Sequence, residues 1–417
     1  MTTMERKVST QLGRLPVWIS GLLPLLVLGL MVAVFAFGNP LALFTANLPP
    51  VENLNIERIQ VVKNGFEATL VNGGPDPVTV AQVTVDDAYW NFDITPSQTI
   101  PRLGRATLHI AYPWVENEPN VIKVITSTGL TFGGEVALAT PSPMPGLDEF
   151  LAYGLLGIYV GILPVGLGML WFPAMKKMGR KWLGGILALT IGLLVFLLLD
   201  TLLESFEMAG ELPGVFQGVP LVLFSALITW LALLAVGARR RSTGNMAPAR
   251  KGLYLAGLIA FGIGLHNLGE GLAIGAAFAI GEAALGSFLV IGFMLHNITE
   301  GVGIVAPLVP STPRKNVAGD QEVTEGPRLA TFLGLTLAAG APAILGAWVG
   351  GFAFSPLLAT IFLGIGLGAI WQVIVEVVSL LRGYAEREGT PLFSWINVAG
   401  FLVGLGIMYL TAFLVKF

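Results

Sequence analysis

The 417-residue sequence contains no cysteine, three histidines and only 12% charged residues. Without cysteine the chain can form neither a disulfide nor a thiolate metal site, whatever compartment it occupies. Hydrophobic residues make up 54% of it, and the mean hydropathy is +0.77. A chain this apolar and this poor in charge does not belong to the soluble globular class. The composition predicts a polytopic membrane protein embedded in the lipid bilayer.

Nothing in the sequence resembles a nucleic-acid-binding module. The lysines and arginines form short groups beside apolar runs and no extended basic face. The net charge of −3 says little about partners, because in a membrane protein the positions of the charges matter more. We expect no nucleic-acid partner.

Nine apolar runs are long enough to cross a bilayer, which takes about 20 residues of α-helix. The first, at about 16–37, is predicted to be an uncleaved anchor, since the apolar part of a signal peptide usually has about 7 to 15 residues. Cleavage near residues 44–46 is the alternative. The other eight runs form a helical core, at about 150–172, 182–204, 217–237, 252–280, 283–306, 329–354, 356–381 and 394–415.

Residues 45–145 are predicted to form a small all-β domain. Polar residues, proline and glycine return here, between short β-branched runs. Asn64-Gly65 and Asn72-Gly73 are typical of type I′ hairpins, because both central positions of that turn need positive φ. His109 lies in an alternating run and is predicted to be a solvent-facing strand residue. The β-branched runs are at 59–62, 78–85 and 121–125.

This domain carries five basic and ten acidic residues. The acidic excess can concentrate cations near a pore mouth, although an ordinary acidic surface is the simpler interpretation. Residues 141–145 are proline-rich and predict a stiff linker. The chain therefore divides into an N-terminus with its anchor helix (1–44), the β domain with its linker (45–145) and an eight-helix domain (146–417).

Lysine and arginine collect in alternate loops of the core, as the positive-inside rule requires. The basic loops follow the first, third, fifth and seventh runs, and the loop at Glu204 to Glu211 is acidic. We therefore expect a multi-pass protein of the plasma membrane. Its N-terminus would be cytoplasmic, and the β domain and the C-terminus extracytoplasmic. The expected fold is an all-α polytopic bundle of eight helices with one N-terminal anchor helix and a small extracytoplasmic all-β domain.

One hexapeptide pattern occurs twice inside these apolar runs, thirty residues apart. The copies are His266-Asn267-Leu268-Gly269-Glu270-Gly271 and His296-Asn297-Ile298-Thr299-Glu300-Gly301. Ionisable residues in membrane helices are rare and mark functional sites by default. At about 1.5 Å per residue, His266 lies roughly 22 Å from Lys251 and His296 roughly 20 Å from Ala283. Because a bilayer with headgroups is about 40 to 45 Å thick, both copies should meet near its middle.

The spacing within each copy suits a metal site. Histidine and glutamate at i and i+4 share a helix face, and the asparagine is three residues from the same glutamate. Imidazole and carboxylate suit zinc, iron(II), manganese or cobalt, whereas copper(I) favours sulfur. One buried histidine could be a hydrogen-bonded core residue, but a duplicated set without a buried lysine or arginine favours a bound cation. Protonation of His266 and His296 at low pH would compete with the metal.

Two more polar pairs lie in the apolar runs at i and i+4. Asp200 and Glu204, near the outer end of the second run, are either part of a path into the site or an interfacial carboxylate pair. Gln372 and Glu376, toward the cytoplasmic end of the seventh run, are either on an exit path or structural.

The eight-span core with H-N-x-x-E-G on its fourth and fifth helices resembles the ZIP family of divalent metal transporters, particularly the prokaryotic branch with H-N-x-P-E-G. The resemblance covers about residues 146–417. It implies flanking helices related by inverted repeats and movement of zinc, or iron and manganese, toward the cytoplasm. It also implies a set of metal ligands: His266, Asn267, Glu270, His296, Asn297 and Glu300.

The sequence departs from the family pattern at four positions. Gly269 and Thr299 stand where this branch usually has proline. Asn297 and Ala341 stand where family members often have acidic residues, which favours one metal in the site over two. The loops at 238–251 and 307–328 contain no histidine, so a histidine-rich regulatory loop is absent.

These features predict a transporter that exchanges part of the water around a divalent cation for histidine and carboxylate ligands and releases the ion by alternating access. A non-transporting metal sensor that signals through the β domain is the alternative. An intramembrane metalloenzyme is a further one, but the chain lacks H-E-x-x-H and an obvious separate general base, so we expect no enzyme activity. The sequence leaves a homodimer and the partner of the β domain open.

Overall fold

The computed structural model describes residues 17–38, 51–241, 248–280, 283–309 and 327–415. Residues 1–51 and 52–417 form two compact units. The first contains helix α2 (Val17–Gly38), an apolar helix of 22 residues with Pro24 inside it. At about 1.5 Å per residue it is about 33 Å long, enough to cross the hydrocarbon core of a bilayer. The expected domain boundary at residue 44 and the cleavage alternative at 44–46 lie outside the described residues.

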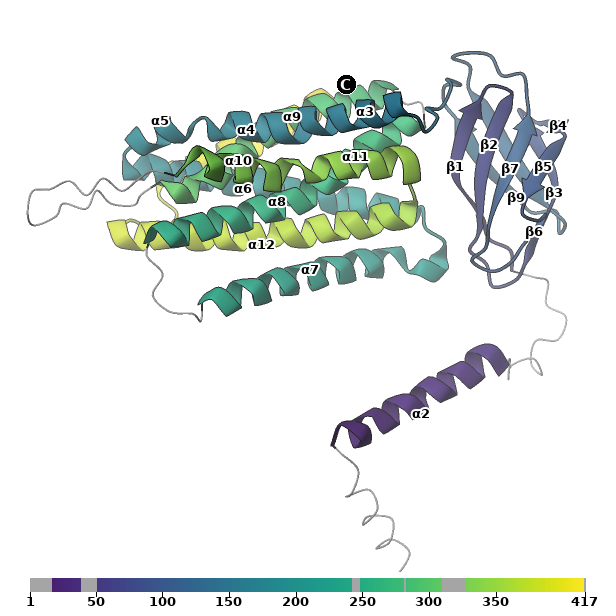
Figure 1. The fold of residues 1–417 in the computed structure, drawn as a ribbon, viewed down its shortest axis with the longest axis horizontal. Helices are drawn as coiled ribbons and strands as arrows, with labels where there is room; N and C mark the ends of the chain where they lie inside the picture. Colours follow the sequence, from purple (N-terminus) through teal and green to yellow (C-terminus); the bar gives the residue numbers. More distant parts are fainter. Residues whose placement is uncertain (1–16, 39–50, 242–247, 281–282, 310–326, 416–417) are drawn as a thin grey trace, which may run out of the picture. The chain divides into compact units, whose positions relative to one another are not determined.

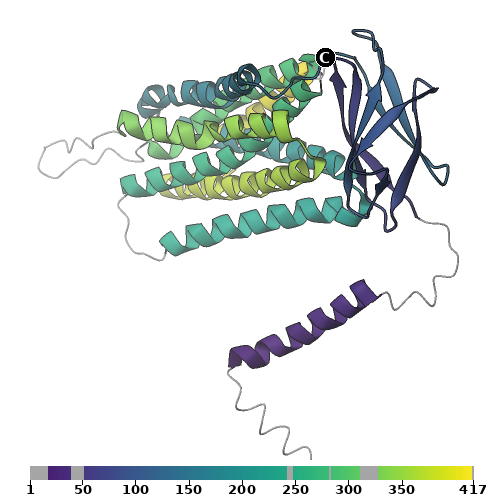
Figure 2. The ribbon, with the colours of Figure 1, turned by 45° about the vertical axis from the view of Figure 1, so that its right-hand side comes forward.

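The β domain is a sandwich of two antiparallel sheets (Figures 1 and 2). One sheet has the strand order β1-β2-β7-β5. The other has the order β4-β3-β8-β9, with β6 paired to β3. The predicted strand runs are confirmed. The strands are β1 (Leu54–Val62), β2 (Gly65–Asn72), β3 (Val78–Val85), β4 (Ala88–Trp90), β5 (Phe92–Thr95), β6 (Thr99–Ile100), β7 (Arg105–Ala111), β8 (Asn120–Thr126) and β9 (Thr131–Val136).

Strand β7 shows why the sheets pack face to face. Its residues alternate, so that Ala106, Leu108 and Ile110 are buried in the core between the sheets. His109 points the other way, is partly exposed, and its Nδ1 lies 3.3 Å from Glu67 Oε1 on the neighbouring strand. The prediction of a solvent-facing strand histidine is confirmed.

The predicted hairpin near Asn64 exists, but its turn lies one residue earlier than expected. Val62 pairs with Gly65, so the two loop residues are Lys63 and Asn64. Gly65 opens β2 with φ of 147°, and a Cβ there would lie 1.8 Å from the carbonyl oxygen of Ile110. The glycine is needed because the neighbouring strand passes so close.

The hairpin predicted at Asn72-Gly73 is wrong. Asn72 ends β2, and the chain then crosses to β3 in the other sheet. The buried Asn72 side chain holds this crossing, since its Nδ2 donates to the carbonyl oxygens of Ile100 and Asp76. A two-residue turn with positive φ at both positions forms instead at Asp86-Asp87, between β3 and β4.

Eight helical spans of the described residues are long and apolar enough to cross a membrane, as predicted. They lie side by side in one bundle (Figure 1). The first span is α3 (Leu147–Gly157), the π-turn η1 (Ile158–Ile162), α4 (Leu163–Met169) and α5 (Phe172–Lys177). The others are α6 (Arg180–Gly210), α7 (Gly218–Arg241), α8 (Pro248–Ala279), α9 (Ala283–Val305), α10 (Leu329–Gly340) with α11 (Pro342–Ala353), α12 (Pro356–Glu388) and α13 (Trp395–Val415).

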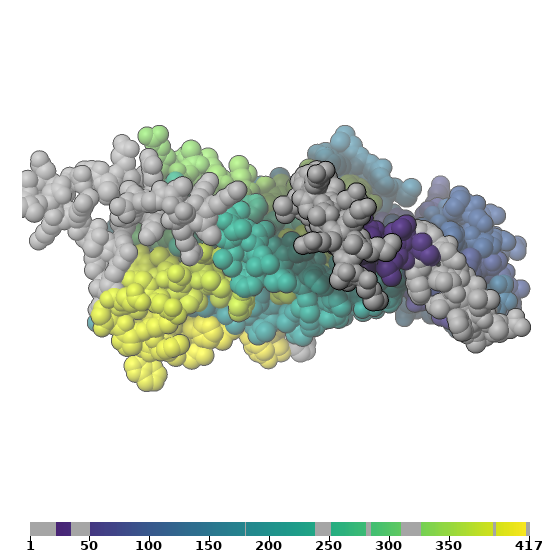
Figure 3. All heavy atoms as spheres, turned by 90° about the horizontal axis from the view of Figure 1, so that it is seen from below, coloured from purple at the N-terminus to yellow at the C-terminus, as the bar shows by residue number. Residues whose placement is uncertain are grey.

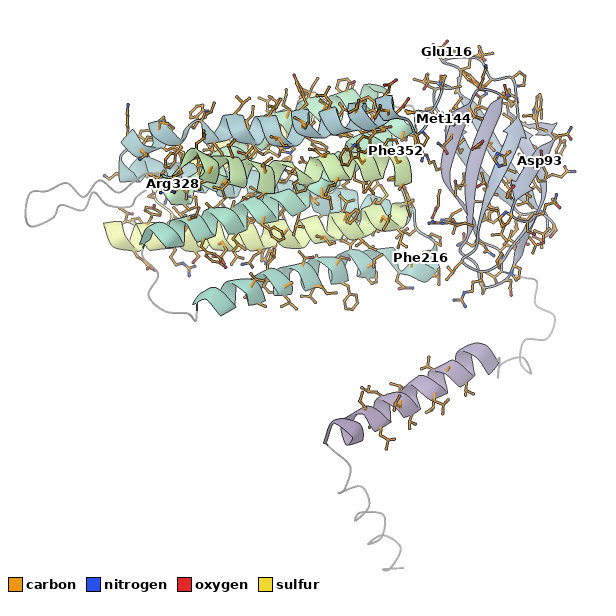
Figure 4. All side chains as sticks on the ribbon, viewed as in Figure 1. Asp93, Glu116, Met144, Phe216, Arg328 and Phe352 are labelled. Carbon is orange, nitrogen blue, oxygen red and sulfur yellow. The ribbon has the colours of Figure 1, made fainter. Side chains whose placement is uncertain are left out.

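The first and sixth spans are interrupted near their middle. The first contains η1 just before Pro164, and the sixth breaks at Ala341, before Pro342. Proline lacks the N–H that would bond the carbonyl four residues earlier, so it opens a helix locally. Figure 4 shows that the sixth span still traverses the bundle, with Arg328 before one end and Phe352 near the other.

Packing within the bundle surrounds α8 and α9. Helix α8 lies against α10, α11 and α12, and α9 lies against α4 and α6. Helix α13 packs on α6, while α7 and α13 expose many large apolar side chains, as lipid-facing helices do. The bundle therefore has a shielded centre formed by the two helices that carry the repeated motif.

Basic residues mark one end of the bundle. Lys176 and Lys177 lie at the end of α5, Arg239 to Arg241 at the end of α7, and Arg382 in the last turns of α12. These helix ends lie together, on the left in Figure 1. The arrangement matches the alternation of basic loops, whereas the side of the membrane that this end faces stays a prediction.

Candidate metal centre

The two motif copies occupy matching positions on α8 and α9. His266, Asn267 and Glu270 are 6%, 0% and 4% exposed, and the three corresponding residues of the second copy have the same values. Both helices run unbroken through Gly269 and Thr299, the positions of the expected proline. The Thr299 hydroxyl donates to the carbonyl oxygen of His296. The six polar side chains are thus buried at the centre of two continuous helices.

Three of the predicted ligands converge on one point. His266 Nε2 lies 3.1 Å from Glu270 Oε1, and His296 Nε2 also hydrogen-bonds this oxygen. One ligand atom of each residue lies within 4.8 Å of those of the other two. Two imidazoles from different helices therefore point at the same carboxylate.

The two asparagines hold the interrupted spans against the motif helices. Asn297 Nδ2 donates to the carbonyl oxygen of Val160 in η1, at 3.1 Å, and to Glu270 Oε2 at 3.0 Å. Asn267 Nδ2 donates to the carbonyl oxygen of Ala339 in α10, also at 3.1 Å. Pro164 cannot donate to Val160, four residues earlier, so this carbonyl is available to the asparagine. The two helix breaks therefore supply the acceptors that orient the motif.

Glycines allow the backbones to approach at this level. A Cβ on Gly161 would lie 2.3 Å from the Gly340 carbonyl oxygen, so the two interrupted spans touch each other beside Val160 and Ala339. A Cβ on Gly271 would lie 2.1 Å from the Ala343 oxygen, and one on Gly301 2.2 Å from the Val165 oxygen. The glycine that follows each motif glutamate thus allows its helix to pack closely against an interrupted span.

Within the described residues, four buried oxygen atoms of the two motifs have no hydrogen-bond partner: both carboxylate oxygens of Glu300 and the amide oxygens of Asn267 and Asn297. The Asn267 amide faces Glu300 without forming a hydrogen bond of normal geometry. All four atoms are acceptors. A buried acceptor without a donor destabilises a protein by about 1 to 3 kcal/mol, and more when it is charged. A bound cation would satisfy these atoms.

The donor set fits a divalent metal. Ligand atoms around one tetrahedral zinc lie about 3.4 Å apart, given zinc–nitrogen distances of about 2.0 to 2.1 Å. The His266, Glu270 and His296 atoms need only small side-chain rotations to reach this spacing. Nitrogen and oxygen donors also accept iron(II), manganese and cobalt. Glu300 lies close enough to interact electrostatically with His296 and Glu270, although it is not one of the three converging ligands.

The predicted outer pair lies beside the cluster. Asp200 and Glu204 are exposed on α6, and they interact electrostatically with His296 and Glu270, respectively. Two carboxylates thus stand near the buried ligands.

The second pair lies on α12. Gln372 and Glu376 are 2% and 7% exposed, and Gln372 Nε2 donates to Glu376 Oε1 at 3.0 Å. This helix also borders the cluster, because a Cβ on Gly366 would lie 3.5 Å from His266 Nδ1. The two pairs therefore lie on α6 and α12, two of the helices that pack against the motif helices.

The Val160 and Ala339 carbonyls belong to the site although no motif in the sequence contains them. Pro164 was the available signal for Val160, since a proline in the middle of an apolar run frees the carbonyl four residues earlier. Pro342 marks the second helix break, but the carbonyl that it frees belongs to Ala338 and not to Ala339. Comparison of the sequence with models of protein families and with curated proteins gave no match. The family resemblance therefore rests on the span count and the paired motif.

Proposed function

We propose that this protein transports divalent metal cations across a membrane, as the resemblance to the ZIP family implies. The observation that carries the proposal is the set of buried donors at one level of the bundle, where His266, Glu270 and His296 converge and Glu300 has two unpartnered oxygens. Zinc is the expected cargo, with iron(II), manganese or cobalt as alternatives.

The two glutamates have the charge that the cargo requires. Glu270 and Glu300 together balance a divalent ion in a region where an unbalanced charge is costly. His266 and His296 add preference for borderline metals over calcium and magnesium, which favour oxygen ligands. With Asn297 and Ala341 in place of acidic residues, the site has charge for one metal.

Asp200 and Glu204 attract the hydrated ion on one side of the centre, and the Gln372–Glu376 pair lies on the way out. The ion exchanges part of its water for imidazole and carboxylate at the centre and leaves on the other side by alternating access between the bundle's repeats. The family resemblance supplies the direction, toward the cytoplasm.

Uptake into proteoliposomes tests the proposal. Vesicles loaded with a metal-sensitive dye should accumulate zinc, and accumulation should fall to the level of empty vesicles for Glu270→Ala and for His296→Ala. Glu207→Ala is the matched control, because Glu207 is an exposed carboxylate on α6. Parallel assays with iron(II), manganese and cobalt identify the cargo.

Undiminished uptake by correctly inserted Glu270→Ala and His296→Ala would overturn the site assignment. Stoichiometric metal binding without uptake by the wild-type protein would favour the sensor. Metal-dependent hydrolysis of a lipid or a peptide would favour the metalloenzyme.

A further inference from the structure

A cavity of about 240 Å³ lies among the helix ends of the bundle, and no residue of the motif helices lines it. It is formed by the start of α6, the end of α12 and the start of α13. The lining residues are Lys181, Gly184, Leu381, Tyr384, Ala385, Thr390, Pro391, Ser394, Trp395, Ile396 and Asn397.

The lining has one positive charge and no carboxylate among these residues. Lys181 supplies the ammonium group, and Thr390 and Ser394 supply hydroxyls. Asn397, 8% exposed, donates from Nδ2 to the Leu392 carbonyl oxygen at 2.9 Å, which fixes the amide. A Cβ on Gly184 would lie 2.9 Å from Asn397 Oδ1, so the glycine makes room for it. The cavity therefore suits an anionic group that also carries a hydroxyl.

Three span ends place the cavity at the surface of the membrane. Lys181 opens the second span, Glu386 closes the seventh and Trp395 opens the eighth. Trp182, Phe393 and Trp395 are 65%, 83% and 88% exposed, as aromatic residues are in the belt at a membrane–water interface. In Figure 3 the C-terminal part of the chain, in yellow, forms the surface at this end of the bundle.

We propose that this cavity binds the headgroup of an anionic phospholipid. The Lys181 ammonium contacts the lipid phosphate, Asn397 Oδ1 accepts from a headgroup hydroxyl, and the exposed aromatic residues cover the upper part of the acyl chains. A basic pocket between membrane helices at the headgroup level is the setting in which such lipids are recognised. The volume is below the about 300 Å³ at which sites for drug-sized ligands begin, which suits a single headgroup.

Lipid titration of the full-length protein in detergent tests this assignment. Dioctanoyl phosphatidylglycerol is the probe, zwitterionic dioctanoyl phosphatidylcholine, which should bind more weakly, is the lipid arm without net charge, and inorganic phosphate is the free-anion arm. Native mass spectrometry counts bound molecules, and ligand-dependent melting gives the affinity. We expect one tightly held phosphatidylglycerol per chain and an affinity about tenfold lower in Lys181→Gln, because a charge-assisted contact is lost.

Two further variants complete the test. Ala385→Leu fills the cavity without changing charge and should weaken binding to a similar extent. Lys177→Gln removes a charge at the same end of the bundle, at the end of α5 and outside the cavity, and should leave binding unchanged. Equal phosphatidylglycerol binding by the wild type, Lys181→Gln and Ala385→Leu would overturn the proposal. Binding of inorganic phosphate as tightly as the lipid would overturn it too, in favour of a free-anion site.

Discussion

At the scale of single residues, Glu300 is the residue that distinguishes a metal site from an ordinary buried polar cluster. The hydrogen bonds among His266, Glu270 and His296 could stabilise helix contacts without any metal. Glu300 does not share in them, since both its oxygens lack a partner among the described residues. A carboxylate buried in this way stabilises nothing by itself, so its presence supports the proposal of a positively charged ligand.

Glu300→Gln should therefore stabilise the metal-free protein and reduce the further stabilisation that bound metal gives. The glutamine removes a buried charge and brings an N–H donor next to acceptor atoms, so the metal-free protein should become more stable, by about 1 to 3 kcal/mol. The melting temperature in a chelator should rise, and the further rise on adding zinc should largely disappear. Glu207→Gln, on the exposed face of α6, should change neither quantity. A lower metal-free melting temperature would show that Glu300 has a structural role.

Asp86 is a second residue to consider at this scale, because hydrogen bonds from its neighbours stabilise its negative charge. Burial tends to raise its pKa, but hydrogen bonds from the Val121 N–H, the Asn120 amide and the Tyr112 hydroxyl outweigh this and lower the pKa below its usual range. A lowered pKa means that the carboxylate contributes stability above the pKa of the unfolded chain, about 3.9. This contribution is lost as the pH falls through the lower folded-state pKa.

Asp86→Asn keeps a side chain that tolerates positive φ and removes the charge. We expect the β domain to lose about 1 kcal/mol at pH 7, a value reduced for the exposure of the site. The difference between variant and wild type should be smaller at a second, acidic pH below the unfolded-chain pKa of about 3.9, because the wild-type contribution is lost as the pH falls toward and through the lower folded-state pKa. Urea unfolding of residues 52–145 at the two pH values measures it. A difference that stays constant with pH would contradict the assignment.

At the scale of elements, the interrupted spans decide how the motif helices are held. The contact of Gly161 with Gly340 lies next to the two carbonyls that accept from Asn297 and Asn267. A methyl group at this contact must push backbone away from backbone, because the nearest atoms, at 2.7 Å, belong to the main chain.

Gly340→Ala should thus disturb the centre although no ligand is changed. Overpacking of this kind destabilises by about 1 to 3 kcal/mol, and we expect a lower melting temperature and reduced uptake in proteoliposomes. Gly334→Ala on the same helix is the matched control, since a Cβ there meets nothing within 4 Å. Equal behaviour of the two variants would show that the Gly161–Gly340 contact does not position the site.

The elements also show which features a sequence can predict. Apolar length and loop charge are properties of contiguous residues, so the eight spans and the shared level of the two motifs followed from them. The hairpin at Asn72-Gly73 failed because the turn propensity is local, whereas the crossing to β3 is set by a buried asparagine bound to Ile100, 28 residues away. Likewise the Val160 and Ala339 carbonyls come from distant spans, and only the prolines near them are visible in the sequence.

At the scale of the whole molecule, the β domain and the helix bundle have separate hydrophobic cores. Residues from Leu54 to Ala139 form the core of the sandwich, and no bundle residue belongs to it. The main core of the bundle runs from Val165 to Met408 and contains no strand residue. The proline-rich linker is bound to the sandwich, because Ser142 exchanges two hydrogen bonds with Val61 in β1. Each part thus has its own source of stability.

A separate core predicts that residues 52–145 fold in isolation, with a cooperative melting transition by circular dichroism. It also predicts that the bundle keeps its function when this segment is replaced by a flexible glycine–serine linker between α2 and α3. Zinc uptake by the shortened protein should remain within about twofold of the wild type, because the interactions that form the centre all come from Val160 and later residues. A sensor that signals through the β domain would bind metal equally well and lose its output. Loss of uptake by a shortened protein that still binds zinc would mean that the β domain takes part in the transport cycle.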